Sequence, residues 1–287
     1  MSDTTLPRPL SAVTEPRAIR LALIGFAVGG LILLVFAPLA VVFAEALAQG
    51  WLAALASLGK PDALAAIRLT LTVTAIAMPL NAAFGLAAAW FITRFDFRGK
   101  ALLITLIDLP FSVSPVVAGL CIVLLFGANS ALGGWLVANG HPIVFALPGI
   151  VLATLFVTFP FVARELIPVM IEQGRSEEEA ALTLGASGWR VLFTVTLPNI
   201  RWALLYGVLL CTARAMGEFG AVAVVSGKIR GQTATMPITI EMLYNEYLSV
   251  AAFSMAGVLT VLALLTLLLK TALEIRHADQ LAATRRH

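Results

Sequence analysis

Two opposite charges lie four residues apart inside an otherwise apolar part of the chain. Arg214 and Glu218 both fall within residues 202–227, which are long and apolar enough to cross a bilayer. A charged side chain at mid-bilayer costs about 2.5–3.5 kcal/mol on insertion scales, but opposite charges at i and i+4 share a helix face and can neutralise each other. A guanidinium group is also a good bidentate partner for a dianion. The pair therefore predicts either a structural ion pair or an anion pathway that Arg214 faces.

A second polar feature interrupts residues 107–120, whose sequence is IDLPFSVSPVVAGL. Pro110 and Pro115 interrupt helical hydrogen bonding, and Ser112 and Ser114 supply hydroxyl groups beside them. Broken backbone at membrane depth is tolerated only where it is buried in protein or lines a wet cavity. The pattern predicts either a simple kink, with both serines bonding to their own helix, or a part of the anion pathway.

The residue patterns of known catalytic machinery are missing from the sequence. None of its Gly-Lys pairs is followed by Ser or Thr with a glycine five residues earlier, so there is no P-loop, and there is no H-E-x-x-H run. The three histidines are scattered and the two cysteines lie in apolar segments, which disfavours a metal site and a disulfide framework. We therefore expect no catalytic residue, no metal ion and no ATP hydrolysis by this chain alone.

The composition indicates that membrane helices position these residues. Of the 287 residues, 60% are hydrophobic and 12% are charged, whereas soluble domains carry about 25% charged residues. The net charge of +3 comes without a dense basic patch, which does not favour a nucleic-acid partner. We predict an all-α integral membrane protein with six transmembrane helices. The expected spans are residues 21–44, 69–93, two spans within 109–163 on either side of the glycine-rich residues 127–142, then 202–227 and 247–269.

The distribution of Lys and Arg predicts the orientation of these spans. With the N-terminus inside, fourteen cations lie on the inner side, four lie outside, and one lies within a span. The four outer cations are Lys60, Arg68, Lys228 and Arg230. We therefore expect cytoplasmic tails at residues 1–20 and 276–287, and a membrane domain at residues 21–275. The first apolar run lacks the short length and cleavage site of a signal peptide, so we expect it to remain as the first span.

The largest polar insertion is residues 175–198, RSEEEAALTLGASGWRVLFTVTLP, which the charge count places in the cytoplasm. Ser176 and Glu179 fit a capping box, and the two glutamates between them would lie in the first helical turn, where negative charge complements the helix dipole. Gly185 is a suitable helix stop, because glycine accepts the left-handed conformation at little cost.

A second short helix is expected to begin near Ser187, and Pro198 precedes the next span. Its apolar residues recur at i, i+3, i+4 and i+8, which places them on one face. These residues are Trp189, Leu192, Phe193 and Leu197. Two short helices bent at a glycine could dock in a groove of another protein or rest on the membrane surface, and the residues alone favour neither.

The spacing within this loop resembles the EAA loop of ABC-importer permeases. Glu179-Ala180-Ala181 is followed after three residues by Gly185, and then at the family's distance by Leu197-Pro198. Further stretches are similar to sulfate/thiosulfate permeases, closest to the CysW type, among them FPFVARELIPVM, LPNIRWALLYGVLL and ARAMGEFGAVAVVSGKIRG. The resemblance implies the MetI-like fold of type I importer permeases. It also implies that the loop docks on a cytoplasmic ATPase subunit through Glu179, Ala180, Ala181, Gly185, Ala186, Leu197 and Pro198.

The same resemblance implies partners and a location. A homologous second permease of the CysT/CysU type would complete the pore, two ATPase subunits would bind ATP and Mg, and a periplasmic protein would deliver sulfate or thiosulfate. No cofactor is expected in this chain, and the expected location is the bacterial inner membrane. Two alternatives are a permease for molybdate or tungstate, whose members are usually shorter and lack the long N-terminal span, and a secondary anion transporter that works alone.

Overall fold

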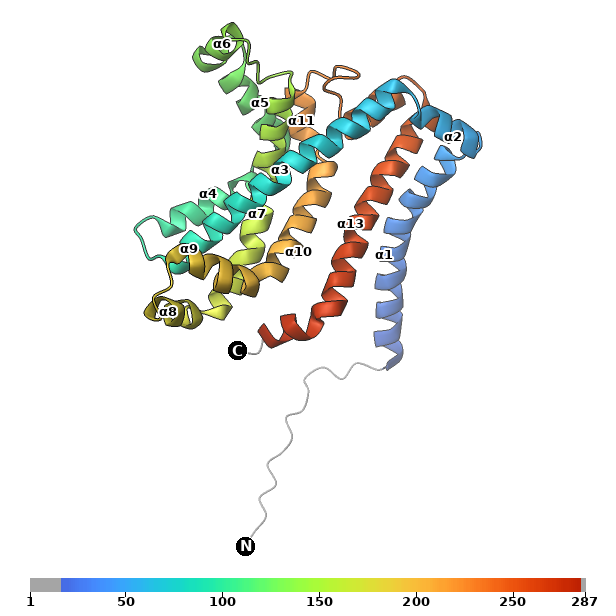
Figure 1. The fold of residues 1–287 in the computed structure, drawn as a ribbon. Helices are drawn as coiled ribbons and strands as arrows, with labels where there is room; N and C mark the ends of the chain where they lie inside the picture. Colours follow the sequence, from blue (N-terminus) through green and yellow to red (C-terminus); the bar gives the residue numbers. More distant parts are fainter. Residues whose placement is uncertain (1–16, 285–287) are drawn as a thin grey trace.

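A computed structural model describes residues 17–284, and within this range every regular element is a helix (Figure 1). The elements are α1 (Arg17–Ala46), α2 (Trp51–Leu58), α3 (Pro61–Arg94), α4 (Lys100–Ser112), α5 (Pro115–Phe126), α6 (Ala131–Ala138), α7 (Leu147–Gln173), α8 (Ser176–Thr183), α9 (Gly188–Val191), the π-helical turn η1 (Leu192–Thr196), α10 (Leu197–Met216), α11 (Gly220–Val225), α12 (Met236–Asn245) and α13 (Ser249–Thr284). The outermost parts of the two predicted tails, residues 1–16 and 285–287, lie outside the described residues.

Five stretches of the described chain are long and apolar enough to cross a bilayer as single helices. They are Ala18–Ala46, Pro61–Arg94, Leu147–Gln173, Gly188–Met216 and Ser249–Ala272. A sixth apolar stretch consists of α4 and α5, which meet at an angle of 107°. With the bent pair counted as one crossing, residues 17–284 contain six candidate membrane spans, the number that the sequence predicts.

The bend between α4 and α5 is much sharper than the simple kink that was one interpretation of the sequence. Val113 and Ser114 have ψ angles of 131° and 133°, so the helix stops at Ser112 and restarts at Pro115. A proline disfavours helical backbone at the residue before it and lacks the amide hydrogen that would continue the helix. Pro115 therefore begins α5, whereas Pro110 lies inside α4.

The centre of the molecule is formed by α3, α7 and α10, which approach closely where glycines face a neighbouring helix. A Cβ atom on Gly85 of α3 would lie 2.6 Å from the Cβ of Val162 of α7. A Cβ atom on Gly207 of α10 would lie 3.2 Å from the Cα of the same valine. Asn81, which is fully buried, donates from Nδ2 to the hydroxyl of Thr158 at 2.7 Å, and this hydrogen bond links α3 to α7 in the apolar interior.

Several predicted spans have wrong boundaries. The helix expected over residues 202–227 ends at Met216, and residues 217–219 separate it from the short helix α11. The last span continues to Thr284, so that α13 includes most of the expected C-terminal tail. Similarly, α3 begins at Pro61, before the expected residue 69. Apolar runs locate a crossing but do not mark helix ends. A helix can break inside the run, as after Met216, and helix-favouring residues can extend it beyond the run, as in α13.

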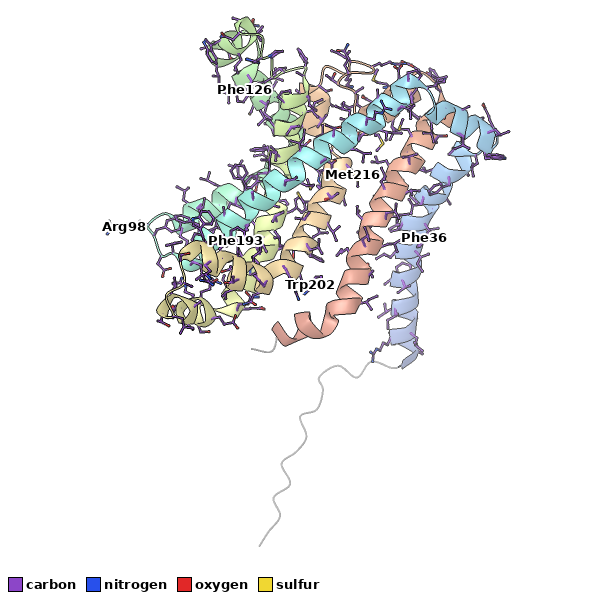
Figure 2. All side chains as sticks on the ribbon, in the orientation of Figure 1. Phe36, Arg98, Phe126, Phe193, Trp202 and Met216 are labelled. Carbon is purple, nitrogen blue, oxygen red and sulfur yellow. The ribbon has the colours of Figure 1, made fainter. Side chains whose placement is uncertain are left out.

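The two ends of the molecule carry different elements (Figure 1). The start of α1, the end of α13 and the α8–α9 segment lie at one end, and α2 and α6 lie at the other. This relative arrangement agrees with the charge count. The helix α1 packs along α13 and directs most of its apolar side chains outward, including Phe36 (Figure 2). Such a face is suited to lipid or to a second membrane subunit.

Candidate functional site

Residues 175–198 form a bent segment, here called the elbow, between α7 and α10. Its first helix, α8, ends in a left-handed turn at Gly185, whose φ is +85°. The amide of Gly185 donates to the carbonyl of Leu182 at 2.9 Å, and the amide of Ala186 donates to that of Ala181 at 3.1 Å. These two bonds form a Schellman motif, which favours glycine at the left-handed position. The predicted helix stop is therefore confirmed.

The capping box predicted at Ser176 and Glu179 is wrong. The helix α8 begins at Ser176 itself, Arg175 occupies the cap position, and no side chain caps the first turn. The carbonyl of Arg175 accepts a hydrogen bond from the amide of Glu179 at 2.9 Å, while its guanidinium group donates to the carbonyl of Thr93 at 2.9 Å. Arg175 is thus anchored to the end of α3, and the helix starts earlier than expected. The three glutamates still lie in the first turn, where they complement the helix dipole.

The sequence predicts a separate second short helix in the elbow, and this prediction is wrong. Residues 188–216 form one helical stretch, in which the π turn η1 joins α9 to α10. At the end of η1, the amide of Leu197 bonds to the carbonyl of Leu192, five residues earlier. Proline in a regular α-helix clashes with the carbonyl four residues before it, and a π turn widens the helix at that point. Pro198 therefore lies inside a continuous helix instead of ending one.

The outer face of the elbow exposes large apolar side chains. They are Leu182, Leu184, Trp189 and Phe193, with Leu184 and Trp189 88% and 74% exposed. The rings of Trp189 and Phe193 stack with centroids 6.3 Å apart. Of the residues that the EAA resemblance assigns to docking, Glu179, Ala180, Gly185 and Pro198 are exposed, and Ala181, Ala186 and Leu197 are half-buried. Exposed apolar side chains gathered in this way mark an interaction surface.

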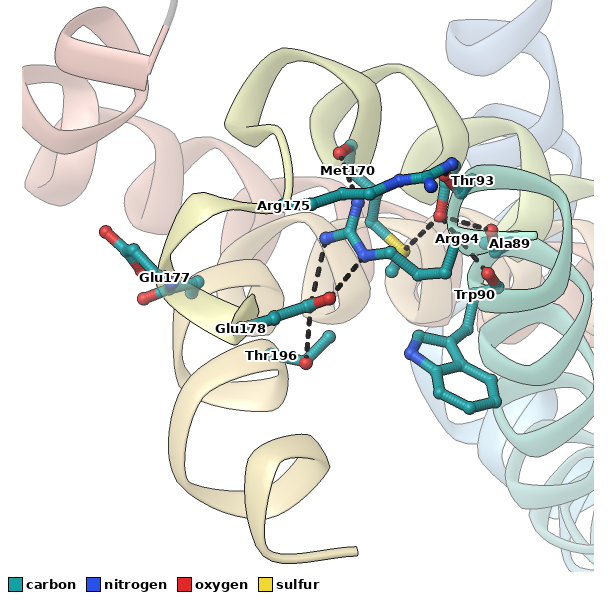
Figure 3. Close-up of polar contacts among 10 residues, drawn as sticks. Ala89, Trp90, Thr93, Arg94, Met170, Arg175, Glu177, Glu178 and Thr196 are labelled. Atoms are coloured by element: carbon teal, nitrogen blue, oxygen red, sulfur yellow. Dashed lines mark hydrogen bonds and ion pairs between the residues drawn. The ribbon is translucent and has the colours of Figure 1, made fainter. Parts of the chain in front are cut away.

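The inner face of the elbow makes an ion pair that the sequence analysis did not anticipate (Figure 3). Arg94 at the end of α3 and Glu178 of α8 approach at two points: Nε lies 2.7 Å from Oε2, and Nη2 donates to Oε1 at 3.0 Å. Their side chains are only 8% and 13% exposed. Only the Nη2 contact has hydrogen-bond geometry, and the Nε contact is an ion pair without a hydrogen bond.

Two further hydrogen bonds complete this contact. The Nη1 atom of Arg94 donates to the carbonyl of Met170 near the end of α7 at 2.9 Å. The hydroxyl of Thr196 in η1 donates to Oε1 of Glu178 at 2.7 Å. We call Arg94, Glu178, Thr196 and the Met170 carbonyl the inner latch, because together they join α3, α7, α8 and η1. No sequence pattern predicts it, since Arg94 and Glu178 are 84 positions apart.

The charged residues predicted within the fifth span, Arg214 and Glu218, form an ion pair at the end of α10. Nη1 of Arg214 lies 2.7 Å from Oε2 of Glu218, and Oε1 of Glu218 accepts a hydrogen bond from the amide of Ala221 at 3.0 Å. The Glu218 side chain is 1% exposed and that of Arg214 is 36% exposed. The two do not share one helix face as expected, because Glu218 lies beyond the last residue of α10. Glu218 caps α11, and Arg214 remains partly accessible.

The break after α10 packs against the break between α4 and α5. A Cβ atom on Gly220 would lie 3.0 Å from the Cβ of Pro115, and one on Gly119 would lie 2.6 Å from the carbonyl oxygen of Ala221. The structure therefore brings together the two interrupted segments that the sequence singled out separately. Ser112 and Ser114 are exposed beside this contact, and the described residues provide no hydrogen bond from either hydroxyl back to its own helix.

A third charged contact joins the residues on either side of residues 109–163, which contain no Asp, Glu, Lys or Arg. Nε of Arg164 in α7 lies 3.1 Å from Oδ1 of Asp108 in α4, and the same guanidinium lies 4.9 Å from the ring centroid of Phe111. No pattern in the sequence predicted this pair. Because the pair ties α4 to α7, it positions the helix that precedes the bend.

The sequence of the chain is similar to those of known transport proteins. Residues 81–277 match the family described as binding-protein-dependent transport system inner membrane component. The chain is 53% identical over 257 residues to the sulfate transport system permease protein CysW of Escherichia coli K12, covering 90% of this chain and 88% of that protein. It is 52% identical to CysW of Synechocystis, covering 90% and 94%, and 36% identical to the sulfate permease CysT of Escherichia coli K12, covering 82% and 85%.

The fold is similar to that of a solved transporter. A chain in the crystal structure of a bacterial alginate ABC transporter superposes with a TM-score of 0.75, covering 90% of this chain and 94% of that chain. At 15% identity, this likeness concerns the fold alone.

Proposed function

Because the chain belongs to the family of inner membrane components of binding-protein-dependent transport systems, we propose that it is a permease subunit of an ATP-driven sulfate importer. The assignment of sulfate as the substrate rests on the 53% identity to a CysW sulfate permease over 90% of this chain. A permease subunit forms the path for the ion and is not an enzyme by itself, which agrees with the sequence expectation.

The importer that we propose contains several subunits. The family includes CysW and CysT relatives, and a second permease of the CysT type would form the other half of the pore. Two ATPase subunits would bind ATP and Mg, so that this chain needs no cofactor of its own, and a periplasmic protein would deliver sulfate. The apolar outer face of the elbow supports an ATPase partner, because Leu184 and Trp189 would otherwise remain in water.

The orientation in the proposal follows the Lys and Arg count. Both tails and the elbow lie in the cytoplasm, and α2 and α6 lie on the periplasmic side. The ATPase subunits then reach the elbow directly. Closure of the ATPase pair would pull on the elbow and tilt the membrane helices, which opens the pathway to one side or the other. Sulfate and ATP bias this equilibrium only through their different affinities for the two states.

The anion pathway in the proposal passes the paired helix breaks. Arg214 offers the accessible part of a guanidinium group, and Ser112 and Ser114 offer exposed hydroxyls on the other break. Glu218 already neutralises part of the arginine's charge. A site for transit must hold its ion weakly enough to release it, and one partly neutralised arginine meets this requirement better than a cluster of free cations.

The test is uptake of radioactive sulfate into proteoliposomes that contain the assembled transporter. We expect uptake that requires ATP and every subunit, with no uptake by this chain alone. Thiosulfate and molybdate are added as competitors: strong inhibition by molybdate, with weak inhibition by unlabelled sulfate, would overturn the substrate assignment. Sulfate uptake by the isolated chain would overturn the subunit assignment.

A further inference from the structure

The helix α8 is attached to the rest of the chain by polar contacts. None of the residues of Ser176–Thr183 is buried, so apolar packing does not hold this helix in place. Its covalent connections are bends, because the chain has a positive φ at Gly174 before the helix and at Gly185 after it. A force applied to α8 must therefore reach the membrane helices mainly through side chains on its inner face.

The inner latch is the buried contact that can carry such a force. Arg94 holds Glu178 at two points, and its third nitrogen is engaged by the carbonyl of Met170. Glu178 is held in turn by Thr196, so neither charged side chain can move without disturbing a second element. Separating a largely desolvated ion pair leaves two uncompensated charges, which makes the pair resist extension.

We propose that the Arg94–Glu178 pair couples α8 mechanically to α3 during transport. The other half of the elbow is connected differently, since α9 continues through η1 into α10 as one helical stretch. One ATPase movement would thus drive two membrane helices, α3 through the latch and α10 through the continuous backbone. Arg94 and Glu178 are positioning residues in this scheme. The inference rests on the proposed function, because the force on α8 comes from the ATPase partner.

The primary test compares transport with ATP hydrolysis in the complete reconstituted transporter. In Glu178→Gln, which keeps the shape of the side chain and removes its charge, we expect ATPase co-purification close to the wild-type level. Sulfate transported per ATP hydrolysed should fall by about fivefold or more, the lower end of typical coupling effects. Lys100→Gln is the matched control, since it neutralises an exposed pair with Asp96 at the same end of the molecule and should leave this ratio unchanged.

A covalent substitute for the latch separates coupling from simple stabilisation. In an Arg94→Cys/Glu178→Cys double variant, made with Cys121→Ser to remove the exposed native thiol, we expect uncoupled ATP hydrolysis while the thiols are free. A short bifunctional thiol reagent should restore transport per ATP. No restoration after complete bridging would mean that the pair only stabilises the fold, and would overturn the proposal.

The remaining outcomes are also decisive. If Glu178→Gln does not assemble, Arg94→Lys takes its place, because it keeps the charge but loses the two-point geometry. An assembled variant with the wild-type ratio overturns the latch and leaves the proposed function intact. A wild-type complex that binds no ATPase or takes up no sulfate overturns both.

Discussion

The Arg214 guanidinium lies 2.7 Å from the carboxylate of Glu218, yet the two side chains have very different surroundings. Glu218 is buried and its second oxygen accepts a hydrogen bond from the amide of Ala221, whereas Arg214 stays partly accessible. The pair therefore gives the carboxylate a structural role and leaves part of the cation accessible, and the contact of Arg214 with the anion stays a prediction. The two roles can be separated by substituting each partner alone.

Replacement of Glu218 by alanine should destabilise the protein. The amide of Ala221 would lose its acceptor and Arg214 its counter-charge, and an unsatisfied buried polar group costs about 1–3 kcal/mol. The expected result is a lower midpoint of thermal unfolding for the purified complex in detergent. An unchanged midpoint would show that the carboxylate does not support the break after α10.

Replacement of Arg214 by glutamine should lower sulfate uptake, which must be expressed per assembled complex because the buried Glu218 carboxylate also loses its counter-charge. The variant would lose the proposed hydrogen bond between the Arg214 guanidinium and the sulfate ion. A hydrogen bond between charged groups is worth about 1.5–3 kcal/mol, which corresponds to a loss of tenfold or more in sulfate uptake. Uptake is measured together with the amount of assembled complex. Full uptake by an intact complex would remove Arg214 from the anion pathway.

Gly185→Val should uncouple the elbow from the ATPase. The residue has a φ of +85°, and left-handed backbone costs a residue with a Cβ atom about 1–2 kcal/mol, more for a β-branched one. We expect normal membrane insertion, lost ATPase association and lost sulfate uptake. Gly188→Val is the matched control, because Gly188 has no positive φ and no neighbouring atom would lie within 4 Å of its Cβ, so its effect should be much smaller.

Gly85→Ala should loosen the central helix packing. The new methyl group would lie 2.6 Å from Val162, and overpacking of this kind costs about 1–3 kcal/mol. The thermal midpoint should fall in this variant. Gly30→Ala on α1 has no neighbouring atom within 4 Å and should not lower the midpoint. Equal effects of the two alanines would contradict the packing argument.

The sequence was sufficient for features that depend on local chemistry. Uncharged runs located the crossings, and the conformational freedom of glycine located the turn at Gly185. The sharp bend before Pro115 was underestimated, because residue types reveal that a helix is interrupted but not the angle at which it resumes.

Contacts between distant segments could not be predicted in the same way. Arg94 was counted only as a cation at the end of a span, and Glu178 only as a first-turn carboxylate, although they form a largely buried pair. Many Arg and Glu side chains fit such roles equally well, and only the packing of α3 beside the elbow selects these two. The cap expected at Ser176 failed for a related reason, since the contact of Arg175 with Thr93 shifted the start of the helix.

The orientation of the chain in the membrane can be tested by chemical labelling. We expect the elbow in the cytoplasm, so in cells that lack the ATPase subunits a cysteine at position 179 should react with a membrane-impermeant maleimide in inside-out vesicles and not in intact cells. Tyr247→Cys is the matched control, because this side chain is 93% exposed in the loop that the charge count places outside, and it should show the opposite pattern. Both variants carry Cys121→Ser, since Cys121 is the exposed native thiol and Cys211 is buried. Labelling of position 179 from outside the cell would place the elbow away from any cytoplasmic ATPase, and the coupling role of its outer face and its latch would fail together.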